Sequence, residues 1–242
     1  MRDFCIIPRI EVNGGKTAGT GEACGETAYR LYCDGADGIL LHNTDYTSAG
    51  VAAMCAAVAA VTERVFVPVK VSGAVFETAQ IRILISEGAD KVFYNTAAVY
   101  SPWRIDETAG RLGSRYVGIA VNCRKIPETS NREVLLNSGT VSSGKDALLW
   151  VYEAQRRGAS ELLLCAMPQQ KSEVFDAFAV RQIIGEIQSP VLLLGDFVTA
   201  ADFAAAAKAG ACAAVSDIFV RGGANIYKIK RELADMGLSL RL

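Results

Sequence analysis

The 242-residue chain is half hydrophobic and has a formal net charge of −1 at pH 7. This length allows a full buried core, and the near-neutral charge argues against nucleic acid or an anionic membrane as a partner. The apolar stretch near the start is too short for a signal peptide or a membrane span. Seven cysteines without a CxxC pair predict reduced thiols in a cytosolic protein. The single histidine, His42, excludes a multi-histidine metal site, and nothing in the sequence calls for a metal or another cofactor.

Short apolar segments alternate with amphipathic or alanine-rich segments, which is typical of a parallel α/β sheet. We expect strands at residues 4–11, 39–43, 65–72, 91–95, 116–122, 161–166, 190–195 and 213–217. We expect helices at residues 23–33, 47–62, 76–87, 101–112, 145–157, 173–187, 199–209 and 224–236. Eight strands, each followed by a helix, predict a single (βα)8 barrel domain over residues 1–242. An open doubly wound sheet is the alternative, but no GxGxxG turn follows a strand. The polar segment 124–144 predicts a loop or hairpin that extends the fifth strand.

Two segments, residues 68–96 and 190–218, share one pattern of strand, turn, helix, turn and strand. They align without a gap at an offset of 122 residues, so that Gly73 matches Gly195 and Asn95 matches Asp217. The offset is about half of the chain, which indicates two half-barrels related by duplication rather than a short tandem repeat.

Small and polar residues close two neighbouring strands of the first copy. Ser72 and Gly73 end one strand, and Asn95 and Thr96 end the next. In a (βα)8 barrel the site lies at the carboxyl ends of the strands, where exposed N–H groups and hydroxyls suit a phosphate. A tight turn needs small residues even without a ligand, so this pattern alone leaves the phosphate site open.

The matching turns of the second copy carry carboxylates. Asp196 and Asp217 stand there, and two carboxylates would repel a phosphate dianion at close range. We therefore expect one phosphate site, in the first copy only.

Glu11 and Asn122 end the first and fifth strands, on opposite sides of the expected barrel mouth. A lone carboxylate can act as a general acid or base, whereas an amide cannot take up a proton at neutral pH. We expect Glu11 and Asn122 to be catalytic positions, with Asn122 orienting the substrate. A structural hydrogen bond is the alternative role for Glu11.

Four segments resemble the cyclase subunit of imidazole glycerol phosphate synthase, a lyase of histidine biosynthesis. They are CIIPRIEVNGGK at 5–16, VSGAVFETA at 71–79, GADKVFYNTAAVYSP at 88–102 and MGLSLRL at 236–242. The resemblance extends over nearly the whole chain. It implies a two-fold (βα)8 barrel, a phosphorylated ribulosyl substrate at the carboxyl ends of the strands, and a glutaminase subunit at the opposite face that supplies ammonia through the barrel.

The resemblance places several residues at the substrate site. Glu11 and Asn122 stand where the family has its two catalytic aspartates, and Asn43 stands where it has a further aspartate. Ser138 matches a loop that follows the fifth strand, and Gly195 belongs to the second half. These matches predict that Asn43, Ser138 and Gly195 line the substrate site.

The second phosphate site of the family is altered here. Its polar loop after the sixth strand appears as MPQQ at 167–170, and Asp196 and Ile218 replace a glycine and a serine. The changes gather at one end of the barrel, so we expect altered or lost cyclase chemistry on a retained fold.

The resemblance also assigns the opposite face of the barrel. Asp90, Lys91 and Glu161 match positions of the partner surface and the ammonia gate, whereas Cys5 and Gly38 replace two charged residues of that gate. Ordinary solvated charges at strand starts are the alternative for Lys91 and Glu161.

Three interpretations of function remain open. The chain is a cyclase subunit, a diverged enzyme for a singly phosphorylated small substrate, or a barrel that binds a partner or metabolite without catalysis.

Overall fold

Eight parallel strands close on themselves to form a barrel. The computed structural model describes residues 3–170 and 173–241. The strands, in their order around the barrel, are β1 (Cys5–Asn13), β3 (Ile39–Asn43), β4 (Val69–Ser72), β5 (Lys91–Tyr94), β6 (Val117–Lys125), β9 (Leu162–Ala166), β10 (Val191–Leu194) and β11 (Ala213–Ser216). Closure follows because β11 pairs with β1 and β5 pairs with β6. The predicted (βα)8 fold is confirmed.

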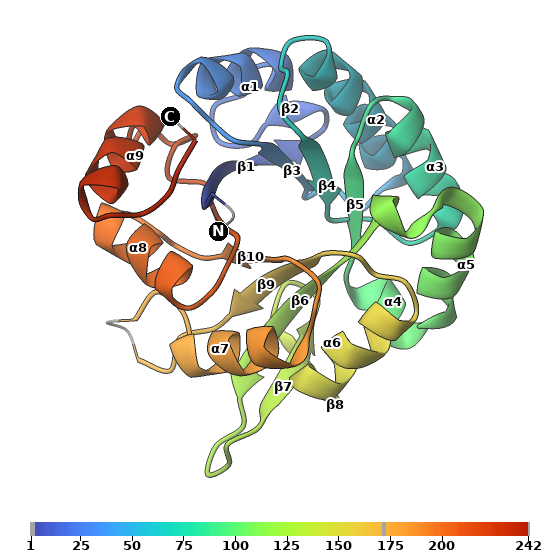
Figure 1. Ribbon diagram of the computed structural model, residues 1–242. Coiled ribbons are helices and arrows are strands. Elements are labelled where there is room, and N and C mark those ends of the chain that lie inside the picture. The colour runs from blue at the N-terminus through green and yellow to red at the C-terminus, as the bar shows by residue number, and fades with distance from the viewer. Residues whose placement is uncertain (1–2, 171–172, 242) are drawn as a thin grey trace.

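Helices surround the barrel as an outer ring (Figure 1). They are α1 (Cys24–Cys33), α2 (Ser48–Thr62), α3 (Thr78–Ser86), α4 (Thr96–Tyr100), α5 (Trp103–Leu112), α6 (Ala147–Arg156), α7 (Ala177–Glu186), α8 (Ala200–Lys208) and α9 (Ile226–Asp235). A short 3-10 turn, Ser114–Tyr116, precedes β6. Within the described ranges no helix has the length and apolar character needed to cross a membrane.

Two expected helices differ from the prediction for local reasons. The helix expected at 101–112 is preceded by the short α4, and Pro102 stands between α4 and α5 because it lacks the N–H needed to continue a helix. The helix expected from 173 begins at Ala177, because Asp176 caps it by accepting from the N–H groups of Phe178 and Ala179. The strand expected from 65 begins at Val69.

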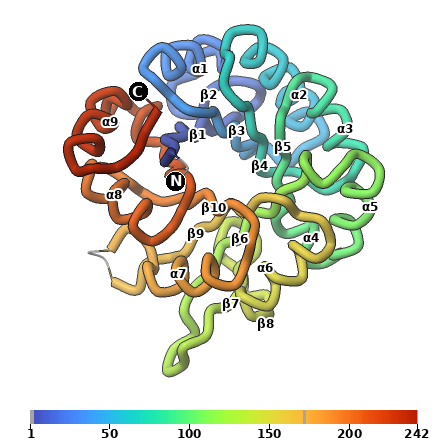
Figure 2. Tube along the Cα trace, in the orientation of Figure 1, coloured from blue at the N-terminus to red at the C-terminus, as the bar shows by residue number. Residues whose placement is uncertain are grey.

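The polar segment after the fifth barrel strand forms a hairpin. β6 pairs with antiparallel β7 (Arg132–Leu136), which pairs with β8 (Val141–Asp146). The loop joining β6 to β7 projects beyond the helix ring (Figure 2). A second small addition, β2 (Lys16–Thr17), pairs with the end of β1.

The two halves of the barrel repeat one another element by element. β4 and β10, α3 and α8, and β5 and β11 each begin and end 122 residues apart. Their helix starts also match. Gln80 Oε1 accepts from the N–H of Glu77 at 3.0 Å, and Asp202 Oδ2 accepts from the N–H of Thr199 at 2.8 Å. The duplication inferred from sequence is therefore expressed in backbone structure and in capping chemistry.

The barrel interior is divided into layers. Its middle is a fully buried apolar layer of one or two side chains from most strands, Ile7, Leu40, Phe93, Leu163, Leu192, Ala213 and Val215. Side chains alternate across a strand, so the next inward positions along the chain lie at the carboxyl ends of the strands and form the mouth. The same alternation places charged side chains at the amino ends.

Candidate functional site

A cavity of about 490 Å³ opens at the carboxyl ends of the strands. Its lining comes mainly from β3, β4, β5 and β6 and the segments that follow them, with contributions from β1, β9 and β10. Among its lining residues Arg9 is the only one with a formal charge at neutral pH, and no carboxylate lines it. The cavity therefore offers one positive group and many neutral hydrogen-bonding groups, which suits an anionic ligand.

Ser72 and Gly73 form the wall of this cavity at the end of β4. The hydroxyl of Ser72 is buried and lies 2.9 Å from Nδ1 of His42. Gly73 has φ +80°, and a Cβ there would lie 2.2 Å from the carbonyl oxygen of Asn43. Ala74 follows with φ +50°, a conformation that disfavours any residue with a Cβ. The turn is thus held in a strained shape directly beside the cavity, and only glycine fits at position 73.

Asn95 and Thr96 form the adjacent wall after β5. Both line the cavity, and the Asn95 amide makes no side-chain hydrogen bond with any residue that the structure describes. Thr96 Oγ1 accepts from the N–H of Asn137 at 3.1 Å, which fastens the β7–β8 turn over the cavity. Ser138 in that turn also lines the cavity, so the hairpin contributes to its wall.

Asn122 lines the cavity from the end of β6, opposite β1. Like Asn95, it makes no side-chain hydrogen bond with a described residue. The side chains of Ala120, Cys165 and Met167, which line the cavity with it, are apolar or sulfur-containing. A free amide presents both a donor and an acceptor to a ligand. Asn122 can therefore orient a bound molecule.

Glu11 lies behind Arg9 rather than on the cavity surface. Its Oε1 accepts from Nη2 of Arg9 at 2.7 Å, and the same Nη2 lies 3.5 Å from Asp217 Oδ2. Asp217 also pairs with the exposed Arg221. This Arg9–carboxylate cluster occupies the mouth on the side of the second half, where the sequence predicted an acidic turn.

Two residues expected to line the site do not line this cavity. Asn43 is buried, its amide lies 3.5 Å from the carbonyl oxygen of Gly50, and its Oδ1 accepts from the N–H of Asp45 at 3.0 Å. Gly195 packs against Phe197. The inward-facing residue of β3 is His42, because side chains alternate along the strand and Asn43 faces the helices.

His42 and Arg9 are the site residues that the sequence analysis missed as functional positions. Burial, together with the nearby positive charge of Arg9, lowers the pKa of His42 to about 4. His42 is consequently neutral at physiological pH. The available signal was the period of two, since Arg9 stands two residues after the buried Ile7 and His42 two residues after Leu40.

The neutral state of His42 predicts a pH dependence of stability. The unfolded chain protonates His42 near pH 6.5, whereas the folded chain does so only near pH 4. Between these values the unfolded state binds more protons, so the free energy of unfolding should fall with falling pH by about 1 kcal/mol per pH unit. Urea unfolding at pH 7, 6 and 5 measures the slope. His42→Gln should flatten it, and an unchanged slope in that variant would contradict the assignment.

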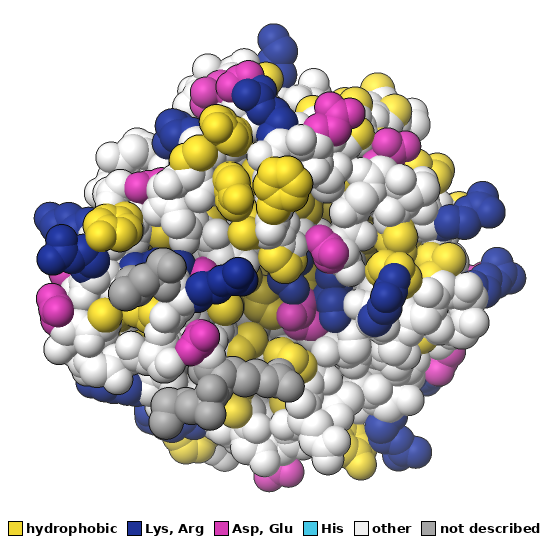
Figure 3. All heavy atoms as spheres, turned by 45° about the horizontal axis from the view of Figure 1, so that its top comes forward, with side chains coloured by type: hydrophobic (Ala, Val, Ile, Leu, Met, Phe, Trp, Pro, Cys, Tyr) yellow, Lys and Arg dark blue, Asp and Glu magenta, His cyan; other side chains and the backbone are white. Residues whose placement is uncertain are grey.

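Charged side chains also meet at the amino ends of the strands. Glu161 Oε2 lies 2.6 Å from Lys70 Nζ and 3.9 Å from Lys91 Nζ, and Lys91 donates to Ser160 Oγ at 2.8 Å. Burial is the first cause of a lowered pKa of Lys91, opposed by Glu161. Figure 3, an oblique view of this side of the barrel, shows acidic and basic side chains gathered in a hollow near its centre. Lys70, which the sequence analysis overlooked, is the nearest partner of Glu161.

Asp90 lies near this cluster and is engaged by the backbone. Its Oδ2 accepts from the N–H of Val69 at 2.8 Å, as Asp37 Oδ2 accepts from the N–H of Ile6 at 2.8 Å. Both aspartates follow a Gly-Ala pair and fasten the start of a neighbouring strand. Asp90 therefore has a structural role beside any role toward a partner.

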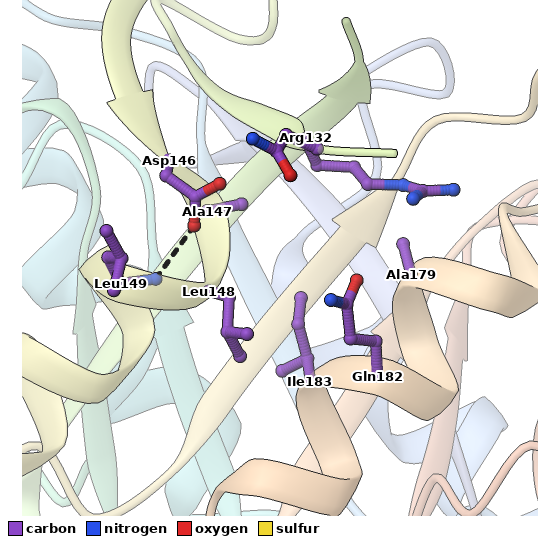
Figure 4. A pocket seen from close by; sticks show the side chains of 9 residues that line it. Arg132, Asp146, Ala147, Leu148, Leu149, Ala179, Gln182 and Ile183 are labelled. Carbon is purple, nitrogen blue, oxygen red and sulfur yellow. Dashed lines mark hydrogen bonds between the residues drawn. The ribbon is translucent and has the colours of Figure 1, made fainter. Parts of the chain in front are cut away.

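A smaller cavity of about 210 Å³ lies outside the barrel, between the starts of α6 and α7 (Figure 4). Its charged groups are already paired. Asp146 accepts from the N–H of Leu149, and Arg132 forms a buried ion pair with Asp176 at 2.8 Å. The charged residues of this cavity already have protein partners, so it is not the candidate site.

Comparisons with known proteins agree on one family. The model of the family described as "Histidine biosynthesis protein" matches residues 11–220. The chain is 32% identical over 251 residues to the imidazole glycerol phosphate synthase subunit HisF of Beutenbergia cavernae, covering 98% of each chain. It is 32% identical over 248 residues to the HisF subunit of Helicobacter hepaticus, again covering 98% of each. It is 30% identical over 247 residues to that of Wolinella succinogenes, covering 98% of this chain and 97% of the relative.

Proposed function

Because this chain belongs to the histidine biosynthesis protein family, we propose that it acts as a cyclase-type subunit of imidazole glycerol phosphate synthase. In this role it is a lyase that binds a phosphorylated ribulosyl aminoimidazole carboxamide at the mouth of the barrel and uses ammonia.

The cavity beside β4 and β5 carries this proposal. Ser72, Gly73, Asn95 and Thr96 surround it, and the amide of Asn95 is not engaged by another described residue. Hydroxyl and amide donors around a concave surface without carboxylates are the chemistry that a phosphate requires. One phosphate of the substrate binds here, and Asn122 orients the part of the substrate that lies across the mouth.

The catalytic carboxylate in this proposal is Glu11. Its Oε1 accepts from Nη2 of Arg9 at 2.7 Å, so Glu11 acts as a base only after this pair opens. Asn122 cannot share proton transfer with it. General acid–base groups each contribute about 10²- to 10⁴-fold to rate, so we expect turnover well below that of a site with two free carboxylates.

Turnover of the bis-phosphorylated substrate with ammonium chloride tests the proposal. Substrate loss and product formation should be measurable in wild type and abolished in Glu11→Ala. Asn122→Asp restores a second carboxylate and should raise the rate. Absence of both turnover and substrate binding in the wild type would refute the proposal.

We further propose that a glutaminase subunit docks at the amino-terminal face of the barrel. The support is the charged cluster of Lys70, Lys91 and Glu161 at the barrel axis, and the fact that the relatives are named as subunits. Asp90, at the same face, is a further candidate contact. Ammonia released there reaches the mouth through the barrel when the Lys70–Glu161 pair opens.

An exposed aromatic residue at this face predicts where the partner binds. Phe66 precedes β4, is 88% exposed, and packs edge-on against Tyr32 with ring centroids 6.4 Å apart. Phe66→Ser should weaken binding of the glutaminase subunit by about tenfold or more, since buried aromatic anchors dominate interfaces. The free energy of unfolding should change little. Tyr100→Ser, at an exposed position on the opposite face, is the control, and equal effects of both would contradict this placement.

A second candidate function is favoured by the Arg9–carboxylate cluster. Arg9, Glu11 and Asp217 form an ion-pair cluster where β1 meets β11, so the site suits a diverged enzyme for a singly phosphorylated small substrate. Binding of a singly phosphorylated ligand without turnover would instead indicate a non-catalytic barrel. We also propose a cytosolic location, which the seven free cysteines support.

A further inference from the structure

Among the described residues that line the cavity, Arg9 alone has a charged side chain, and part of its guanidinium has no partner among the described residues. Nη2 donates to Glu11, whereas Nε is buried without a hydrogen bond to any described residue. A buried N–H donor without an acceptor is costly, because it loses its hydrogen bonds to water and gains none. Nη1 likewise makes no hydrogen bond with a described residue, and it is not buried, so an acceptor on a ligand in the cavity can reach it.

We propose that Arg9 is a specificity-determining residue that binds a second anionic group of the ligand, a carboxylate or phosphate oxyanion. The inference rests on the proposed phosphate site beside Ser72 and Asn95, and it adds a second anchor across the mouth. The ligand class is therefore a small molecule with a phosphate at one end and another oxyanion at the other.

The contacts around Arg9 allow a ligand oxyanion to replace one of its protein partners. The contact of Arg9 with Asp217 is long, 3.5 Å, and Asp217 has a second partner in Arg221. Asp217 can therefore be replaced by a ligand oxyanion without being left unpaired. Glu11, at 2.7 Å, continues to hold the guanidinium in place. Guanidinium–oxyanion contacts are charge-assisted and among the stronger hydrogen bonds of proteins.

The described residues of the second half offer no alternative anchor at this cavity. Gly195, Asp196 and Asp217 do not line it, and the carboxylates of the last two would repel an oxyanion. Arg9 projects from β1, which pairs directly with β11, so it stands beside the turn where Asp217 is found. The positive charge for the far end of the ligand therefore comes from β1 and not from that turn.

Two probes that differ in one anionic group test the proposal. Glycerol 3-phosphate carries only the phosphate, and 3-phosphoglycerate carries a phosphate and a carboxylate. By titration calorimetry the wild type should bind 3-phosphoglycerate about tenfold or more tightly than glycerol 3-phosphate, the contribution of one charge-assisted contact. Arg9→Met should remove this preference and leave glycerol 3-phosphate binding in place.

Arg111→Met is the matched control. It removes the same charge from an exposed ion pair with Glu107, and Arg111 does not line the cavity, so the preference should persist. Asp217→Asn provides a second route if Arg9→Met does not fold, because removing the competing carboxylate should strengthen 3-phosphoglycerate binding several-fold.

The outcomes separate this inference from the proposed function. Equal affinities of the two probes in the wild type, a preference that survives Arg9→Met, or no gain in Asp217→Asn would each overturn the role of Arg9 while leaving the phosphate site intact. Failure of both probes to bind would overturn the phosphate site and the Arg9 anchor together.

Discussion

Replacement of Gly73 by alanine is expected to destabilise the protein by about 3 kcal/mol or more and to abolish phosphate binding. Gly73 has φ +80°, and an added Cβ would lie 2.2 Å from the backbone oxygen of Asn43. Neither atom is the end of a flexible side chain, so β3 and β4 would have to separate at the cavity wall. Chemical denaturation gives the stability, and calorimetric titration with glycerol 3-phosphate gives the binding.

Variants at two other glycines distinguish the steric clash with β3 from backbone strain. Gly19 has φ +83° with open space around it, so Gly19→Ala adds only backbone strain of about 1 kcal/mol. Gly195 occupies the matching position in the second half, where a Cβ would lie 3.2 Å from the ring of Phe197 and where φ is not positive. Gly195→Ala should leave ligand binding unchanged. A Gly73→Ala variant that resembles either control would contradict the close approach of β3 and β4.

Replacement of Glu161 by alanine is the second large expected effect. Lys70 and Lys91 are 13% and 14% exposed, and Glu161 is the only carboxylate with which either forms an ion pair in the described chain. Removing one member of a buried ion pair leaves unpaired charge in the interior, which typically costs about 3 to 5 kcal/mol. The two lysines are also cross-strand neighbours, so their repulsion adds to the loss. Urea unfolding near neutral pH measures the change.

The control for Glu161 is an exposed ion pair of the same charge type. Glu153→Ala removes the partner of Arg157 on the surface of α6 and should cost less than about 1 kcal/mol. In a double variant, Lys70→Met with Glu161→Gln, part of the stability should return, because the closest pair of charges is removed together and Lys91 no longer faces a second lysine, although Lys91 keeps its own charge. If Glu161→Ala unfolds no more easily than Glu153→Ala, the lysines are better hydrated than their burial indicates.

The fold could be predicted because its signals are periodic and local. Apolar strands, amphipathic helices and the 122-residue offset each depend on residue type and spacing alone, and the offset recurs at the ends of β4, α3 and β5. The start of α7, expected at residue 173 and found at Ala177, depends instead on one side chain. Asp176 takes the cap of α7 while paired with Arg132 on a distant hairpin, a tertiary contact that sequence spacing does not reveal.

The site was harder to predict because the direction of each side chain, into the barrel or toward the helices, matters as much as its position along the strand. Choosing the last residue of each strand selected Asn43, which faces the helices, and left out His42, which faces the cavity. The same choice favoured Glu11 over Arg9. Lys70 was missed at the opposite end of the barrel, although it stands two residues before Ser72 and therefore on the same, inward side of β4. In a barrel, inward positions follow a period of two from the buried central layer, and that layer identifies them.

The central claim is that only the first of the two half-barrels still has a phosphate site. A crystal structure with the bis-phosphorylated substrate bound would test it most directly. The account predicts one phosphate against Ser72, Gly73, Asn95 and Thr96, with the other end of the molecule at Arg9. A phosphate seated between Gly195 and Asp217, with or without one in the first half, would contradict it.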